Sequence, residues 1–420
     1  MHAVLSQGFN LALMLFTALL LVVDRSIGAV ALLMLLLSIA MLLTRHNRGI
    51  KLEQDEKLLL VAMAIYPLAV LINMLVHQNS DLADFDIASR FLLVLPIFFA
   101  VRRFGASKSW LYAGLFIGAI GAGCFGYYQK YVLGLVVAHG YISKISFGDL
   151  SLILGVLSLT YCIKPKPDHP RSKWLIMLAI IAFGFGLMGS ITSGTRGGWI
   201  AIPVMLWLIL REAIEIKPIR FGIYACFLIA TLGVYQNNQL VKYKVDKAVA
   251  DTISYLSEEG SVEGSAGTRL EMWRAAGIMF QQSPVFGVGE GEYRSSVKQL
   301  ISQKQVARNI GYGHAHSEML TTLAELGVFG LAALLAFYAL LLRFFYRMRS
   351  VDLQLATAGL LLVFGYVDFG LTQAMLSHNI TTVFLVALVV ILAGCLSHQK
   401  RLHGTPSNSP ADSGITSSTG

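Results

Sequence analysis

The chain has 420 residues, of which 55% are hydrophobic and 14% are charged, and it carries a formal net charge of +9. So apolar a composition excludes a soluble globular domain of this length and indicates a polytopic membrane protein. The four cysteines fall inside apolar runs without a CxxC pair, which argues against a disulfide framework and against a zinc site.

Twelve apolar runs approach the roughly 20 residues that a helix needs to cross a bilayer, although the fourth and eighth runs are short. No small-residue cleavage site follows the first run, so we interpret it as a retained helix rather than a signal peptide. The predicted fold class is therefore an all-α polytopic membrane protein with about 12 transmembrane helices. The runs lie at 9–24, 27–44, 58–76, 90–101, 110–128, 147–163, 174–189, 198–210, 219–235, 327–346, 354–372 and 382–396.

The distribution of lysine and arginine over the short loops predicts the orientation of these helices. With both termini in the cytoplasm, the inner segments carry nineteen basic residues, whereas the short outer segments carry five. Because basic residues are retained on the cytoplasmic side, this asymmetry supports twelve spans and predicts that residues 236–326 lie outside the cytoplasm. The topology explains most of the net charge, and we expect no nucleic-acid partner. The five outer residues are Arg25, Arg90, Lys130, Lys144 and Arg196.

Four parts of the chain follow from this topology. Residues 1–235 would hold nine transmembrane helices, residues 236–326 an outer helical loop with the candidate catalytic elements, and residues 327–396 the last three transmembrane helices. The chain from His403 onward is rich in Ser, Pro and Gly and cannot bury enough apolar surface to fold, so residues 397–420 are predicted to be a disordered cytoplasmic tail.

Two segments of the outer loop have a recognisable pattern. Apolar positions recur every three or four residues from Leu240 to Leu256, with charged residues between them. This spacing predicts an amphipathic helix that lies on the membrane or on the helix bundle and is ended by Gly260. The segment "GVGEGEYRSS" (287–296) has alternating glycines, but no strand precedes it and it does not match a dinucleotide fingerprint, so it predicts a turn.

The segment "GTRLEMW" contains Thr268 and, three residues later, Glu271, which together form a capping-box pattern. The pattern predicts a helix from Thr268 to about Gln282, with Arg269 at its first position. Free backbone N–H groups, the positive end of the helix dipole and a guanidinium would then meet at one point. Such a point is a good site for a phosphate group.

The same Gly-Thr-Arg tripeptide recurs in "SGTRGGW" (193–199), between the seventh and eighth runs. Thr195 could cap the next helix, Arg196 would again lie at a helix start, and the two following glycines would allow a ligand or another backbone to approach closely. An arginine at a membrane boundary is usually a snorkelling anchor. Sorting of positive charge to the inside does not explain Arg196, however, so Arg196 and Arg269 together predict a diphosphate site on the outer face.

Three further arginines are weaker candidates for the same site. Arg274 lies one helical turn beyond Arg269, and Arg294 follows in the same outer loop. Arg90 opens the fourth apolar run, where Asp86 at i−4 offers it an ordinary salt-bridge partner.

Two histidines, His314 and His316, precede the tenth run in "GYGHAHSEML" (311–320). With Glu318 they could supply three metal ligands, but "HSEMLTTLAEL" has helical spacing, and residues two apart on a helix diverge. The sequence therefore favours a base over a metal ligand. The helix dipole keeps a histidine at a helix start neutral and able to accept a proton. We predict this role for His316, with His314 as the alternative.

Two other polar residues lie near the last apolar runs. His378, in the short "SHN" segment between the last two runs, is a further histidine candidate. Asp368 lies inside the eleventh run, and an intramembrane acid is a functional candidate by default. Pairing of Asp368 with a neighbouring helix would explain it equally well.

These features together resemble the O-antigen ligase family, the bacterial membrane glycosyltransferases that join a polysaccharide to lipid A-core. The resemblance covers roughly residues 9–396 and rests on about twelve spans, the long outer loop before the tenth span and the two arginine motifs. The family's pattern of His, then Asn, Ser or Gln, then nine residues and Gly fits His316, Ser317 and Gly327. "SPVFGVGEG" (283–291) is similar to the loop that follows the second arginine helix in these proteins.

The resemblance implies a GT-C-like fold in the bacterial inner membrane, with an active site that faces the periplasm. It implies transfer of a glycan from undecaprenyl diphosphate to a sugar hydroxyl of lipid A-core, with inversion at the anomeric carbon and without a metal or other cofactor. By resemblance, Arg196 and Arg269 would bind the diphosphate and His316 would accept the hydroxyl proton. The expected partners are this donor, this acceptor and membrane lipids, and no nucleotide is expected.

The sequence does not state the acceptor, so related activities remain as alternatives. An O-antigen polymerase or a protein O-oligosaccharyltransferase would share the fold, the donor and the arginines, and we favour the ligase because of the histidine motif. A transporter or flippase is a more distant alternative. It predicts a repeat between the two halves of the chain, whereas this sequence has no such repeat and its candidate residues gather on one face.

Overall fold

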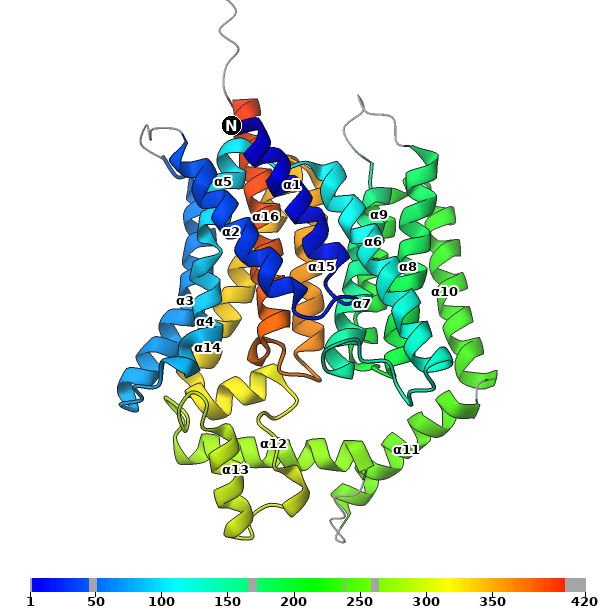
Figure 1. Ribbon diagram of the computed structural model, residues 1–420. Coiled ribbons are helices and arrows are strands. Elements are labelled where there is room, and N and C mark those ends of the chain that lie inside the picture. Colours follow the sequence, from blue (N-terminus) through cyan, green and yellow to red (C-terminus); the bar gives the residue numbers. More distant parts are fainter. Residues whose placement is uncertain (1, 45–50, 165–171, 238, 258–263, 405–420) are drawn as a thin grey trace, which may run out of the picture.

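A computed structural model describes residues 2–44, 51–164, 172–237, 239–257 and 264–404, and these residues form helices joined by loops, without a β-strand among them (Figure 1). The α-helices are α1 (His2–Ala18), α2 (Ser26–Leu43), α3 (Gln54–Val76), α4 (Leu82–Leu93), α5 (Leu95–Phe104), α6 (Lys108–Tyr127), α7 (Lys144–Leu159), α8 (Lys173–Ser193), α9 (Ile202–Ala213), α10 (Lys217–Asn237), α11 (Gln239–Leu256), α12 (Gly264–Gln282), α13 (Tyr293–Ser302), α14 (Glu318–Arg347), α15 (Leu353–Phe369) and α16 (Asn379–Gly404).

The twelve predicted apolar runs all fall on helical stretches of this bundle, which confirms an all-helical, polytopic membrane protein. Within the described residues, seven helices are long and apolar enough to cross a membrane, so the predicted number of twelve spans is not confirmed. The fourth run is divided between α4 and α5, and Pro96 lies in the first turn of α5. The seven helices are α2, α3, α6, α7, α8, α14 and α16.

The bundle is held together by close helix packing around α16, which is almost completely buried. Small residues let the backbones of α7 and α8 come close to each other. A Cβ atom added at Gly155 would lie 3.1 Å from the Cα atom of Phe183, and one added at Gly186 would lie 2.9 Å from the Cα atom of Gly155. Larger side chains at these two glycines would therefore push α7 and α8 apart.

A layer made of α11, α12 and α13 crosses one end of the bundle, opposite the end where the N-terminus and the last turns of α16 lie (Figure 1). The predicted amphipathic helix from Leu240 to Leu256 is confirmed as α11, and Gly260 lies outside the described residues. The apolar side chains of Val249, Ile253 and Leu256 are exposed rather than packed on the bundle. The predicted tail also needs correction, because α16 continues to Gly404 and only residues 405–420 lie outside the described part of the chain.

α14 is broken at Gly327, whose backbone dihedral angles are φ +64° and ψ −162°. A helix break frees backbone groups, which must find other partners when they are buried. Here residues 284–289 fill the break and exchange four backbone hydrogen bonds with residues 324–329. The donor and acceptor residues are Val328 and Pro284 (2.9 Å), Phe329 and Val285 (3.1 Å), Val288 and Ala324 (2.9 Å), and Gly289 and Glu325 (2.9 Å).

Asn73, a fully buried residue near the end of α3, holds this loop in place. Its side-chain nitrogen donates to the carbonyl of Phe286 at 2.5 Å and its side-chain oxygen accepts from the amide of Glu290 at 3.0 Å. The "SPVFGVGEG" segment is therefore the structural partner of the break in α14. The predicted turn at 287–296 is confirmed as far as Glu292, after which α13 begins.

Candidate active site

The two histidines lie in the loop that leads into α14, at the end of the bundle covered by α11, α12 and α13. α14 begins at Glu318, so His316 comes two residues before the helix, as predicted, and His314 lies in the same loop. The prediction that helical spacing separates the two rings is wrong, because neither residue is helical and the ring centroids are 4.5 Å apart. His316 has a φ of +48°, a conformation that is uncommon for non-glycine residues.

The His316 ring is tied to the loop between α15 and α16. Its Nδ1 atom lies 2.7 Å from the side-chain oxygen of Gln373, and the side-chain nitrogen of Gln373 lies 3.1 Å from Nε2 of His378. His314 contacts the same group, since Nδ1 of His314 accepts a hydrogen bond from the backbone amide of His316 at 3.2 Å. Gln373 therefore joins His316 to His378, and His314 joins the group through the backbone of His316. The sequence indicated the three histidines but not the glutamine.

Buried contacts anchor this loop on both sides. The backbone amide of Glu318 donates to the carbonyl of Gly370 at 2.7 Å, and its carboxylate accepts from the amide of Leu376 at 2.7 Å. On the other side, the indole nitrogen of Trp273 on α12 donates to the carbonyl of Ala315 at 3.1 Å. Glu318 thus holds the α15–α16 loop against the start of α14. Among the described residues, no group of three or more His, Cys, Asp and Glu side chains is arranged to hold a metal ion.

Arg269 lies on α12 at the same end of the bundle, but not at the predicted helix start. α12 begins at Gly264, and the Thr268 hydroxyl donates to the carbonyl of Gly264 at 2.7 Å instead of capping a helix. Glu271 likewise accepts from the Tyr255 hydroxyl and from the amide of Ala307. The predicted capping box is therefore wrong, because the helix starts one turn earlier. The argument for Arg269 consequently rests on its charge and position rather than on the helix dipole.

Arg196 precedes a single 3₁₀ turn, Gly197–Trp199, that leads toward α9. Thr195 does not cap that helix, because its hydroxyl donates to the carbonyl of Lys144 at 3.0 Å. The sequence predicted that a ligand or another backbone approaches the two glycines closely. In the structure a side chain of the protein does so, because a Cβ atom on Gly198 would lie 2.8 Å from Oδ1 of Asp149. The loop therefore lies tightly against the first turns of α7 and leaves the Arg196 side chain exposed.

Electrostatic coupling shows that these segments converge. Burial lowers the pKa of His316, whereas its hydrogen bond to Gln373 raises that pKa; the charges of Arg269, His378 and Lys144 lower it further. Burial and the charge of Arg196 also lower the pKa of Arg269. His314, which is half-buried beside two other histidines, has a pKa lowered to about 3. At neutral pH the site therefore combines fixed cations with uncharged imidazoles.

The guanidiniums of Arg196 and Arg269 are not engaged by any carboxylate in salt-bridge range within the described part of the chain. The nearest acid in electrostatic terms is Asp149 on α7, which raises the pKa of Arg269. Asp149 is fully buried, and neither of its carboxylate oxygens has a hydrogen-bond partner among the described residues. Asp149 was not among the residues predicted from the sequence, although an acid inside the apolar run 147–163 is the signal that could have identified it.

Asp368 and two of the three secondary arginines have ordinary partners. Asp368 accepts a hydrogen bond from the backbone amide of Ala201 at 3.3 Å, just before α9, so the predicted pairing with a neighbouring helix describes it well. The other partners and environments are as follows: Arg90 pairs with Asp86 at 2.6 Å, Arg274 pairs with Glu271 at 3.2 Å, and Arg294 is exposed on α13.

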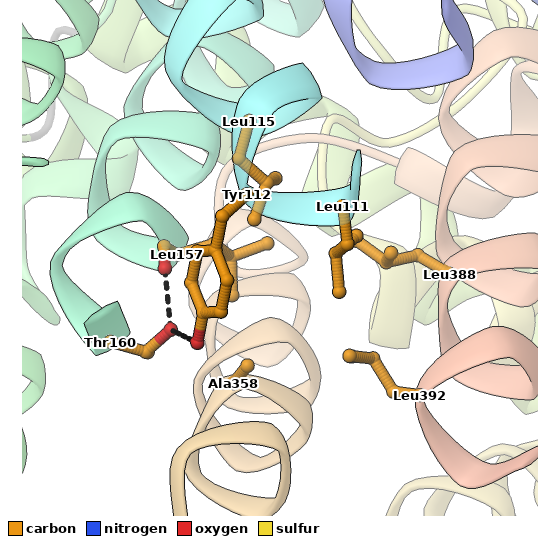
Figure 2. A pocket seen from close by; sticks show the side chains of 8 residues that line it. All are labelled: Leu111, Tyr112, Leu115, Leu157, Thr160, Ala358, Leu388 and Leu392. Carbon is orange, nitrogen blue, oxygen red and sulfur yellow. Dashed lines mark hydrogen bonds between the residues drawn. The ribbon is translucent and has the colours of Figure 1, made fainter. Parts of the chain in front are cut away.

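A separate apolar gap lies inside the bundle among α6, α7, α15 and α16, near the ends of α6 and α7 that point away from the histidines (Figure 2). It has no room for a water-sized molecule, and its two polar side chains satisfy each other, since the Tyr112 and Thr160 hydroxyls are 3.0 Å apart. This gap is therefore a packing feature rather than a substrate site. Its apolar lining consists of Leu111, Leu115, Leu157, Ala358, Leu388 and Leu392.

The fold and the site define a polytopic membrane protein with a polar, cationic and histidine-bearing site at one end of its helix bundle. Comparison with known proteins supports the family resemblance. The O-antigen ligase family profile matches residues 178–335, a range that includes Arg196, Arg269, His314 and His316. Over this range the chain is similar to the O-antigen ligase family, in agreement with its motifs.

Two relatives are similar over longer stretches. An uncharacterized protein from Haemophilus influenzae is 24% identical over 356 residues, which are 80% of this chain and 86% of that protein. An O-antigen ligase from Escherichia coli is 23% identical over 248 residues, which are 58% of this chain and 56% of that protein. The match to the second relative therefore spans little more than half of each protein.

Proposed function

We propose that this protein is an O-antigen ligase of the bacterial inner membrane, with both termini in the cytoplasm and the site facing the periplasm. It would transfer a glycan from undecaprenyl diphosphate to a sugar hydroxyl of lipid A-core, with inversion and without a metal. The observation that carries the proposal is the convergence of a neutral, hydrogen-bonded His316 with the cations Arg196 and Arg269 at one end of the bundle.

The cations suit the leaving group of such a reaction. When the bond between the glycan and the diphosphate breaks, negative charge develops on the departing phosphate oxygen, and fixed guanidiniums stabilise that charge. Arg269 is half-buried, so its charge acts in a less polar environment than an exposed side chain would. Arg196 and Lys144 add positive charge at the same end of α7, which favours binding of the dianionic donor.

The histidine suits the acceptor. A sugar hydroxyl is a weak nucleophile, and a positioned base that takes its proton during attack typically accelerates such a step by about 10²–10⁴-fold. The lowered pKa keeps the His316 imidazole uncharged at neutral pH, which is the form that can accept a proton. In the proposed step the hydroxyl oxygen bonds to the anomeric carbon, its proton moves to His316, and undecaprenyl diphosphate leaves from the opposite face.

The purified protein tests this proposal most directly. It would be incubated with a glycan on undecaprenyl diphosphate and with lipopolysaccharide that lacks O-antigen, with and without EDTA. We expect glycan on the lipid A-core in both reactions. Extension of the carrier-linked glycan in place of this product would identify a polymerase, and transfer to a protein hydroxyl would identify a protein O-oligosaccharyltransferase.

Replacement of Arg269 by methionine is expected to reduce transfer by about 100-fold, because loss of one preorganised donor to a developing anion typically has an effect of that size. Arg269→Lys keeps the charge but loses the two-pronged geometry, so it should retain part of the activity. Initial rates at several donor concentrations would measure the effect.

The control for Arg269 is Lys298→Met, which removes an exposed charge from α13 in the same helical layer. Its transfer rate should match that of the unmodified protein. An Arg269→Met rate equal to that of Lys298→Met would remove Arg269 from the proposed diphosphate site.

A further inference from the structure

We propose that Gln373 is a positioning residue that holds His316 in the tautomer with its proton on Nδ1, so that Nε2 is free to accept a proton. This inference rests on the proposed role of His316 as the base. Gln373 lies outside the segment 178–335 that matches the family profile, in the loop between α15 and α16.

The hydrogen-bond geometry determines the tautomer. The side-chain oxygen of Gln373 lies 2.7 Å from Nδ1 of His316, and an amide oxygen can only accept a hydrogen bond. Nδ1 must therefore carry the proton. Because a neutral imidazole has one N–H, Nε2 is left with a free lone pair. Gln373 is 2% exposed, so its amide makes this bond away from bulk solvent.

His378 is the partner of the other end of the Gln373 amide, in the orientation that the structure gives it. The amide nitrogen of Gln373 lies 3.1 Å from Nε2 of His378, so it donates its hydrogen to that ring atom. If the amide turned over, its nitrogen would face Nδ1 of His316 and donate to it. The proton of His316 would then have to move to Nε2, and the base would lose its acceptor atom. His378 therefore acts on His316 through Gln373.

His314 has a different hydrogen-bond role, which distinguishes the two candidate bases. Nδ1 of His314 accepts the backbone N–H of His316 at 3.2 Å, so the proton of the His314 ring lies on Nε2. The lone pair of His314 is thus used to hold the backbone of a residue whose φ is +48°. His314 supports the conformation of His316 and has no free acceptor atom for a substrate proton.

The pH dependence follows from the groups around His316. Those groups are His314 on its own loop, Arg269 on α12, Lys144 at the start of α7, His378 before α16, and the Tyr312 ring. The base is active when neutral, so the rate falls as the pH drops through the pKa of His316. The bond to Gln373 raises this pKa. A glutamate at position 373 would raise it further, whereas a methionine would remove the acceptor and lower it.

The test compares Gln373→Met and Gln373→Glu with the unmodified protein in the transfer assay, over a range of pH. We expect kcat to fall on the order of 10- to 100-fold in Gln373→Met, with little change in KM. Loss of a hydrogen-bond partner that orients a functional histidine typically has an effect of this size. Gln373→Glu should keep substantial activity, and the acidic limb of its pH profile should move to higher pH. A merely structural role would not move that limb.

A second measurement uses no substrate. Diethyl pyrocarbonate reacts with the unprotonated nitrogen of histidine, so mass spectrometry of the modified protein as a function of pH reports the titration of His316. The exposed His77 serves as an internal reference in the same digest. We expect the His316 titration to move to higher pH in Gln373→Glu and to lower pH in Gln373→Met, with the extent of His316 modification normalised to that of His77.

The two measurements separate this inference from the proposed function. If both Gln373 variants keep the kcat and the His316 titration of the unmodified protein, the positioning role is wrong even when His316 is essential for transfer. If the His316 titration shifts as expected but no glycan reaches lipid A-core, the positioning role stands and the proposed ligase activity is wrong. Folding of each variant is checked by size-exclusion chromatography in detergent. If Gln373→Met does not fold, the pH profile and the His316 titration of Gln373→Glu still test the inference.

Discussion

Replacement of His316 by alanine is expected to abolish capping of lipopolysaccharide in cells, that is, the attachment of O-antigen to lipid A-core. Transfer by the purified protein should slow by about 10²–10⁴-fold, the usual contribution of a positioned base. The substitution removes the acceptor of the hydroxyl proton but leaves Arg196 and Arg269 in place, so donor binding should persist. Long glycan should therefore accumulate on its lipid carrier while lipid A-core stays uncapped. Electrophoresis of lipopolysaccharide and analysis of extracted carrier lipids would measure the two pools separately.

His139→Ala is the matched control for His316→Ala, because His139 is an exposed histidine in the loop before α7, at the same end of the bundle. Cells that carry this variant should cap lipopolysaccharide normally. A change in the length of the glycan chains in His316→Ala cells, with capping intact, would contradict the ligase proposal and favour a polymerase.

The helical architecture could be predicted because it depends on local properties of the sequence. Apolar runs such as 58–76 and 174–189 correspond closely to α3 and α8, since a segment of that length and composition has few alternatives to a buried helix. The amphipathic spacing between Leu240 and Leu256 predicted α11 for the same reason. Helix starts were less predictable: the capping pattern at Thr268 was overridden by contacts of Glu271 with Tyr255 and Ala307.

The candidate site could be predicted only in part, because it is assembled from segments far apart in the chain. Arg196 and Arg269 stood out by the repeated Gly-Thr-Arg tripeptide, and His316 by its position at a predicted helix start. Gln373 did not, since nothing near it in the sequence indicates that the α15–α16 loop reaches the start of α14. The close approach of Asp149 to Gly198 is also a product of packing, because these residues are 49 positions apart in the chain.

The family pattern around the histidine has a physical explanation at its other end. Gly327 comes eleven residues after His316 and adopts a backbone conformation, φ +64° and ψ −162°, that is essentially restricted to glycine. The break at Gly327 separates the first turns of α14, which bear Glu318, from the rest of the helix. The nine residues between Ser317 and Gly327 in the pattern therefore form the short helix that connects the proposed base, His316, to the break in α14.

Gly327→Ala is consequently expected to destabilise the protein by at least about 3 kcal/mol, because a side chain in this conformation costs about 1–3 kcal/mol and each backbone hydrogen bond lost adds about 1 kcal/mol. A Cβ atom at this position would overlap the carbonyl of Val285 and the amide of Phe286, which are backbone atoms that cannot move without breaking the bonds across the helix break. The midpoint of thermal unfolding in detergent should fall, and transfer should be lost as the loop and the start of α14 shift.

Gly277→Ala on α12 is the control, since a Cβ atom there has no neighbour within 4 Å and the backbone is helical. Alanine is more favourable than glycine inside a helix, so this variant should unfold at the same temperature as the unmodified protein or slightly higher. If the thermal unfolding midpoints of Gly327→Ala and Gly277→Ala are equal and Gly327→Ala transfers glycan at the normal rate, the break in α14 is not needed to position His316. A loss of transfer without a loss of stability would instead show that the break acts on the site alone, through the orientation of the helix start that carries Glu318.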